Sequence, residues 1–323
     1  MLNVFAISLL LLAMPLAFAA DAVGATRIAR WQGDRQAAFC LMFDDSCESD
    51  VTNVMPVLLK NQLTATFYVN PGSGQWAKHR QAWEKDIPAA GMELANHTMT
   101  HKGIHDDAEA EREIGGCNDV IRKLIPSAKL ISWGQPGGIK DADWKLTKEQ
   151  LAALLKTKNL VPRPDFGGRG AMIAVKTADE MMGLVDKAVK AGGMEAVIYH
   201  GVGGDWIVTP LPVFTEFAEK LAARRDQVWI TGHIKAHQYA TEREAAKVAV
   251  EKSRPDTVRL TLTCTADAEL YDQPLTLITT VPAEWKRCTI IQGKNTATVE
   301  AAAGSVRYEA LPAGGQITIS AAK

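Results

Sequence analysis

The stretch AAFCLMFDDS, residues 37–46, joins two opposed features. Its first seven residues are apolar, which is typical of a buried β-strand. Two aspartates, Asp44 and Asp45, follow immediately. Adjacent carboxylates repel each other and resist burial, so we expect their charge to serve a purpose at the end of this strand.

Outward from this strand, short apolar runs alternate with segments of helical period up to about residue 231, which is the pattern of an α/β fold. Strands are predicted at residues 37–43, 64–69, 92–95, 129–133, 171–175, 195–199 and 227–230. Helices are predicted at residues 51–59, 109–124, 147–155, 178–191 and 214–223. Seven or so β/α repeats imply an open doubly wound sheet or a barrel, and both place their chemistry at the carboxyl ends of the strands.

The pattern changes near the C-terminus. A last helix is predicted at residues 237–252, and the sequence SRPD at residues 253–256 marks the boundary. Beyond it the helical period disappears, and six short strands are predicted at residues 258–263, 275–281, 288–291, 297–300, 306–310 and 316–319. We therefore expect a large domain at residues 21–252 and a small, β-sandwich-like domain at residues 253–323, with a structural or sugar-contacting role.

Residues 1–20 contain no charged side chain and end in small residues, which is typical of a secretory signal peptide. An uncleaved N-terminal anchor is the alternative, because the stretch is about long enough to span a bilayer. No later segment is long and apolar enough to cross a membrane. We therefore expect a secreted or periplasmic protein without stable membrane insertion.

Charge and cysteine content narrow the function further. The 36 Lys and Arg residues balance 37 Asp and Glu residues, so the chain has no field to attract nucleic acid, and a neutral substrate suits it better. Five cysteines in an oxidising compartment allow two disulfides. The predicted pairs are Cys264 with Cys288 and Cys47 with Cys117, which leaves Cys40 buried in its strand.

Polar residues gather at the predicted strand ends. His97 and His101 follow the third strand in ANHTMTH, and His200 follows a later one in AVIYHG. Histidines four residues apart lie on one face of a helix, where both can bind one cation, and one carboxylate of the aspartate pair would complete the set. Each signal has a plainer interpretation: a chance HxxxH pair, or an Asp pair that caps a helix.

Four motifs together resemble the polysaccharide deacetylases of carbohydrate esterase family four, the NodB-homology family. They are LMFDDS, ELANHTMTH, SWGQPGG and VIYHG, and the resemblance spans about residues 37–239. It implies a distorted β/α barrel of about seven strands, followed here by the small all-β domain.

The resemblance also implies roles for the residues. It assigns Asp44 as the general base, Asp45, His97 and His101 as the metal ligands, and His200 as the general acid. A divalent metal, with Zn²⁺ expected, would assist hydrolysis of an acetyl group on a glycan substrate. Peptidoglycan, chitin-like chains and acetylated xylan all fit.

The sequence departs from the family at one position. Gly134 stands where the family has an arginine that orients the base, and Arg163 or Arg169 is the expected replacement. Trp133 and Trp206 are candidates for sugar stacking, with a place in the core as the alternative.

Two polar residues near the motifs also have two interpretations. His105 extends the histidine spacing but is not expected to be a ligand. Asp205 could orient His200 or serve only a turn.

Two other functions stay open. A non-catalytic carbohydrate-binding protein on a decayed barrel would explain the missing arginine, and metal content would distinguish it. A hydrolase of C–N bonds in small amides could use the same barrel, and a screen of small amides against acetylated oligosaccharides would decide.

Overall fold

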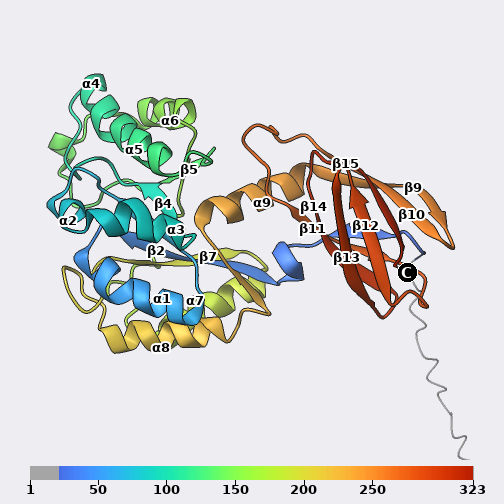
Figure 1. Cartoon of the computed structure of the whole chain (residues 1–323). Coiled ribbons are helices and arrows are strands. Elements are labelled where there is room, and N and C mark those ends of the chain that lie inside the picture. Colours follow the sequence, from blue (N-terminus) through green and yellow to red (C-terminus); the bar gives the residue numbers. More distant parts are fainter. Residues whose placement is uncertain (1–21, 323) are drawn as a thin grey trace, which may run out of the picture.

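Two sheets organise the chain, as the computed structural model shows for residues 22–322 (Figure 1). One is parallel and carries most helices, and the other is antiparallel. Helix α9 (His233–Ala245) runs between them. The predicted signal peptide lies outside the described residues.

The parallel sheet has seven strands, and the predicted fold class is confirmed. Its order is β6-β5-β4-β3-β2-β7, and β8 pairs with β2 as well. Every pair is parallel. The strands are β2 (Ala37–Asp44), β3 (Ala65–Val69), β4 (Glu93–Asn96), β5 (Ile131–Trp133), β6 (Leu160–Pro162), β7 (Met194–Tyr199) and β8 (Val228–Ile230). In the described chain no ladder joins β6 to β7, so the sheet is an open half-barrel.

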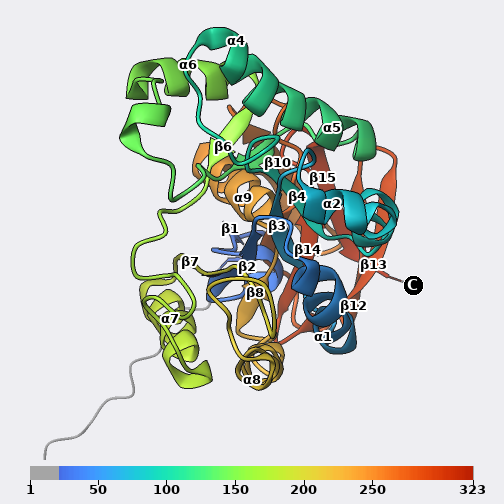
Figure 2. The same cartoon turned by 90° about the vertical axis from the view of Figure 1, so that its left-hand side faces the viewer.

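Helices cover the sheet from two sides (Figure 2). On one side lie α1 (Met55–Asn61), α7 (Ala178–Ala191) and α8 (Leu211–Ala222), and on the other α4 (Asp107–Ala110), α5 (Gly116–Leu124) and α6 (Lys148–Thr157). Two short helices, α2 (Gly74–Lys78) and α3 (Ile87–Ala89), follow β3. The apolar run of β2 is buried along its whole length, which makes it the centre of the core.

Local sequence explains the best-predicted helix, α7, which occupies the expected residues 178–191. Thr177 caps its start, because the Thr177 hydroxyl accepts from the Glu180 backbone N–H while the Glu180 carboxylate accepts from the N–H of Thr177. Gly192 ends it at φ 62°, a left-handed conformation that glycine adopts without strain.

Two predictions in the large domain are wrong. Residues 171–175 form no strand, because the chain turns back at Met172 (φ 63°), whose N–H donates to Val175 O at 2.7 Å. The fifth strand of the parallel sheet in chain order is instead β6, which was not predicted. The predicted helix 237–252 ends at Ala245, and β9 (Ala246–Arg254) follows, because its alternating apolar residues pair with β10.

The second sheet is antiparallel, in the order β1-β11-β14-β13-β12-β15-β10-β9. All six predicted C-terminal strands are present: β10 (Thr257–Cys264), β11 (Leu275–Thr280), β12 (Arg287–Gln292), β13 (Asn295–Ala302), β14 (Ser305–Ala310) and β15 (Gly315–Ala321). Strand β1 (Thr26–Ile28), near the other end of the chain, pairs with β11. The division at residue 253 stays a prediction, but β1 and β9 join this sheet from the other side of that boundary.

The predicted disulfides are wrong, because all five cysteines are free. The thiols of the predicted pair Cys47 and Cys117 face backbone carbonyls instead of each other. Cys47 Sγ lies 3.6 Å from Asp44 O, and Cys117 Sγ lies 3.5 Å from Val69 O. Among the described residues, no helix combines the length and apolar character that a bilayer crossing needs.

Candidate metal centre

The end of β2 fixes the two aspartates. Phe43 stacks between Phe67 and Tyr199, with ring centroids 5.1 and 5.0 Å away, which anchors the strand. Asp44 is its last residue. Asp45 then takes φ 76°, a left-handed conformation that Asp tolerates better than most residues, and its N–H donates to Tyr68 O at 3.1 Å. The two carboxylates therefore diverge.

A loop, and not a helix, brings His97 and His101 together, so the prediction that they lie on one face of a helix is wrong. Thr98 and His101 have φ values of 66° and 57°, so the chain after β4 curls back on itself. The Asn70 side chain holds this curl by donating to the carbonyls of His97 and Thr98. The imidazole centroids of His97 and His101 lie 5.1 Å apart.

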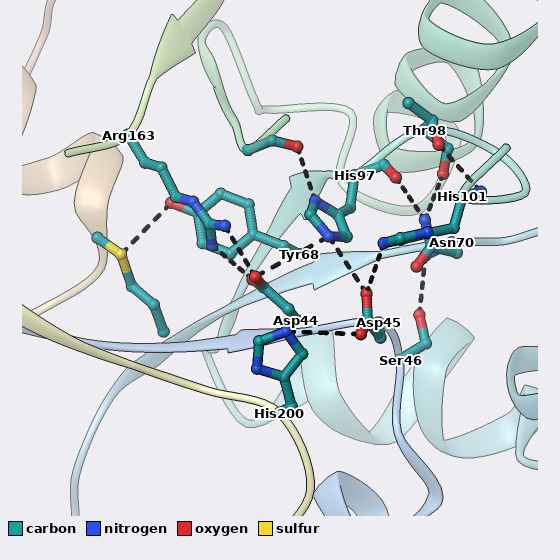
Figure 3. Close-up of polar contacts among 12 residues, drawn as sticks. Asp44, Asp45, Ser46, Tyr68, Asn70, His97, Thr98, His101, Arg163 and His200 are labelled. Atoms are coloured by element: carbon teal, nitrogen blue, oxygen red, sulfur yellow. Dashed lines mark hydrogen bonds and ion pairs between the residues drawn. The ribbon is translucent and has the colours of Figure 1, made fainter. Parts of the chain in front are cut away.

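Asp45, His97 and His101 converge on one point (Figure 3). Asp45 Oδ1 lies 3.2 Å from Nε2 of each histidine. That oxygen is buried and forms no hydrogen bond. His97 Nδ1 lies 2.7 Å from Gly134 O; because a carbonyl only accepts, the proton sits on Nδ1, and the Nε2 lone pair faces Asp45. Such a group of nitrogen and oxygen donors fits a divalent cation.

Charge in this group is balanced locally. Burial alone would raise the pKa of the Asp45 carboxyl, but His101 and His97 beside it lower that pKa well below its usual value. Contact with Asp45 in turn raises the pKa of His101. Among the side chains that the structure describes, these three are the one group of His, Cys, Asp and Glu with the spacing to hold a metal ion.

Asp44 forms a two-pronged ion pair with Arg163, the residue that follows β6 (Figure 3). Arg163 Nη2 donates to Asp44 Oδ2 at 2.7 Å, and Nη1 donates to Oδ1. The guanidinium also lies over the Tyr68 ring, 4.3 Å from its centroid. Burial works against ionisation of Asp44, but the charge of Arg163 holds its pKa below the usual value.

This pair explains the departure at Gly134. A Cβ at that position would lie 2.8 Å from Tyr68 Cδ1 and 2.9 Å from Arg163 Nε, so the Arg163 side chain occupies the space next to this residue. Of the two expected replacements, Arg163 is correct. Arg169 instead donates to Glu195, at 2.7 and 3.2 Å.

His200 follows β7 and lies beside the group formed by Asp45, His97 and His101. Its Nε2 lies 3.8 Å from Asp45 Oδ2, and its buried Nδ1 has no hydrogen-bond partner in the described chain. Asp205 does not orient it, because that carboxylate accepts from the Ser49 backbone N–H at 2.8 Å. His105 lies apart from the group and contacts Glu109.

Trp133 and Trp206, the two candidates for sugar stacking, differ in exposure and in hydrogen bonding. Trp133 is buried in the core, whereas Trp206 is 42% exposed and donates its indole N–H to Asp45 Oδ2 at 2.7 Å. The sequence indicates Trp206 only as a candidate for sugar stacking; its bond to Asp45 has no local signal, because no sequence pattern connects residues 45 and 206. A pocket of about 360 Å³ opens here, lined among others by Asp44, Asp45, His101, Arg163, His200 and Trp206.

Comparison with known proteins finds similarity to one family over part of the chain. The profile described as "Polysaccharide deacetylase" matches residues 32–153. A chitooligosaccharide deacetylase from Sinorhizobium fredii is 35% identical over 106 residues, which cover 32% of this chain and 48% of that protein. One from Bradyrhizobium is 33% identical over 119 residues, which cover 35% and 53%. The chain thus spans about half the length of these curated relatives.

A solved structure is similar as well. The family 4 carbohydrate esterase from Streptomyces lividans, in complex with acetate, matches at 22% identity and a TM-score of 0.44, covering 61% of this chain and 93% of that one. The resemblance seen in the motifs is confirmed by the profile and the curated relatives.

Proposed function

We propose, on the premise that residues 32–153 belong to the polysaccharide deacetylase family, that this chain is a secreted, metal-dependent deacetylase. It would hydrolyse acetyl groups on an acetylated polysaccharide or oligosaccharide. The observation that carries the proposal is the unbonded Oδ1 of Asp45, which faces two imidazole nitrogens inside a pocket that also holds Asp44 and His200.

Asp45, His97 and His101 would hold the ion. Zn²⁺ suits two imidazoles and a carboxylate, and three protein ligands leave a position open, as in hydrolytic zinc sites. When bound, the ion would polarise the acetyl carbonyl and make a water molecule more acidic.

Asp44 would act as the base. Its carboxylate lines the pocket, and the Arg163 pair keeps it ionised and fixed in orientation. Both oxygens retain a lone pair after accepting from Arg163, so either can take a proton from the attacking water.

His200 would act as the acid. It follows β7, the neighbour of β2 in the sheet, and lines the same pocket, where a protonated imidazole can deliver a proton to the leaving amine or alkoxide. Base and acid then come from different strands and flank the reacting group.

The substrate is proposed to be a neutral acetylated glycan. Arg163 is the sole Lys or Arg among the described residues that line the pocket, and Asp44 already neutralises it. The curated relatives are named for chitooligosaccharides, and the sequence offers no anion-binding motif.

The alternative of a non-catalytic glycan-binding protein drew on the missing arginine and on the C-terminal β-domain. Arg163 removes the first of these arguments, because it reaches Asp44 from a different strand.

Acetate release tests the proposal. The purified chain is incubated with acetylated chitooligosaccharides, peptidoglycan and xylan, with and without a chelator, and with small amides for comparison. We expect release from at least one glycan, loss with the chelator and recovery with Zn²⁺. Release from small amides alone would favour the C–N hydrolase, and no release with no bound metal would overturn the proposal.

Export is a separate proposal. It depends on the charge-free stretch at residues 1–20, and N-terminal sequencing of the protein from the culture medium or periplasm would test it. Cleavage near residue 20 is expected, and an intact Met1 in the cell pellet would contradict it.

A further inference from the structure

The two oxygens of the Asp45 carboxylate have different surroundings. Oδ1 faces His97 and His101 and forms no hydrogen bond. Oδ2 accepts the indole N–H of Trp206 at 2.7 Å (Figure 3 shows the Asp45 group without Trp206). His200 Nε2 lies 3.8 Å from this same oxygen, too far for a hydrogen bond.

This difference matters for a metal ligand. A carboxylate can turn about its last bond and offer either oxygen, or both, to an ion. A donor fixed on Oδ2 removes that freedom and leaves Oδ1 alone for the cation. Groups that orient ligands in this way typically change metal affinity by about 10–100-fold.

The loop after β7 holds Trp206 firmly. Gly201 N donates to Trp206 O at 2.9 Å, and Thr209 N donates to Gly201 O at 2.8 Å. The Asp205 side chain ties the loop to Ser49. Ile207 has φ 47°, an unusual value for a β-branched residue, so the surrounding contacts impose the loop conformation.

The Trp206 ring also has an exposed side. It is 42% exposed, and its neighbours Ile207 and Ile173, at 40% and 54%, line the same pocket. Large apolar side chains at a pocket rim suit the apolar face of a sugar ring. The N–H and the ring of Trp206 thus point to two different tasks.

We propose that Trp206 is a positioning residue for the metal ligand Asp45: its N–H fixes Oδ2 so that Oδ1 alone faces the ion, while its ring forms a wall for the substrate. This inference rests on the proposed function, since it requires an ion between Asp45, His97 and His101. It assigns the two tasks to separable parts of one side chain.

Two variants separate the tasks. Trp206→Phe keeps a ring and removes the N–H, whereas Ile207→Ala trims the same rim without a hydrogen bond to Asp45. The metal-free full-length chain is titrated with Zn²⁺ against a competing chelator dye to obtain Kd. KM for an acetylated chitooligosaccharide is then measured at saturating Zn²⁺.

We expect Trp206→Phe to raise the Zn²⁺ Kd about 10–100-fold with KM changed less than threefold. Ile207→Ala should leave Kd unchanged and raise KM. The increase in melting temperature on adding Zn²⁺ gives a second measure of affinity within each variant, independent of its stability without metal.

The outcomes are distinct. A Trp206→Phe Kd within twofold of the wild-type value would overturn this inference alone. A wild-type chain that binds no Zn²⁺ would overturn both this inference and the proposed function.

Discussion

Asp44 and Glu93 lie at opposite ends of the parallel sheet, and their carboxylates have different hydrogen-bond partners. Asp44 ends β2 at the carboxyl end of the sheet and pairs with Arg163. Glu93 begins β4 at the amino end and accepts from the backbone N–H of Ile234 at 3.0 Å and from the Thr66 hydroxyl at 3.2 Å.

Their ionisation differs accordingly. Arg163 overcomes the effect of burial and lowers the pKa of Asp44, whereas burial raises the pKa of Glu93 to about 7, because its hydrogen-bond donors and the charge of Lys235 offset burial only in part. Burial alone therefore does not decide the charge of an acid here; a two-pronged ion pair with arginine outweighs it. Ionisation of Asp44 suits its proposed role as base, whereas Glu93 accepts hydrogen bonds at the start of α9.

The larger of the two cavities at the ends of the parallel sheet is not the one that holds the proposed site. A cavity of about 610 Å³ lies at the amino end beside Glu93, larger than the 360 Å³ pocket at the carboxyl end. None of the predicted site residues lines it. Asp44, Asp45, His101 and His200 of the proposed site line the smaller pocket instead.

The largest expected effect comes from removing a ligand. Asp45→Ala or His97→Ala should abolish Zn²⁺ binding and acetate release together, because each takes away one of three donors. Metal content and acetate release are measured on the same preparation. Glu93→Gln, at the other end of the sheet, is the control and should retain both; full activity in either ligand variant would contradict the assignment.

Asp44→Asn should keep the metal and lose turnover. The amide retains the shape but cannot take a proton, so kcat should fall by about 10²–10⁴. Bound Zn²⁺ is measured alongside kcat. A near-normal kcat would remove Asp44 from its role as base and with it the contrast to Glu93.

The residues at the carboxyl end of the sheet could be predicted well from the sequence. A continuous apolar run followed by two acids is a local signal, so β2, Asp44 and Asp45 could be found without the fold. The HxxxH pair was found too, but through the wrong geometry, since positive φ values at Thr98 and His101 are not visible in the spacing.

Pairings between residues far apart in the sequence were harder to predict. Arg163 pairs with Asp44 across 119 positions of the sequence, so the sequence alone could not decide between Arg163 and Arg169 as the partner of Asp44. Only the placement of β6 shows that Arg163 is the partner. Strand β9 was missed because residues 246–254 follow a helix without a break, and their alternation gains a partner only when β10 lies beside them. Long-range pairing, which local patterns do not record, decides both.

Arg163→Lys tests the cationic partner directly. Lysine keeps the charge but not the two parallel hydrogen bonds, so Asp44 should lose its fixed orientation. We expect kcat to fall by about 10–100-fold, the equivalent of one charged hydrogen bond, with Zn²⁺ affinity unchanged. Arg169→Lys is the matched control, because it weakens a similar pair with Glu195 and should leave kcat unaltered. Equal loss in both variants would indicate a general effect on folding.

The last prediction concerns how the stability of the folded chain depends on pH, and it is set at the amino end of the sheet. With a folded pKa of about 7 against an ordinary value of 4.5, Glu93 binds more protons in the folded chain than in the unfolded chain between these pH values. The free energy of unfolding therefore decreases as pH rises through this window, by roughly 3 kcal/mol at most.

Glu93→Gln should remove this decrease, because the amide still accepts from Ile234 N–H but does not ionise. Denaturant unfolding at pH 5 and pH 8 measures it, in a Glu242→Gln background, since burial also raises the pKa of Glu242 to about 7. If the free energy of unfolding changes by the same amount between pH 5 and pH 8 with and without Glu93, then Glu93 is already ionised in the folded chain at pH 5. An acid would then stay charged there without an arginine partner.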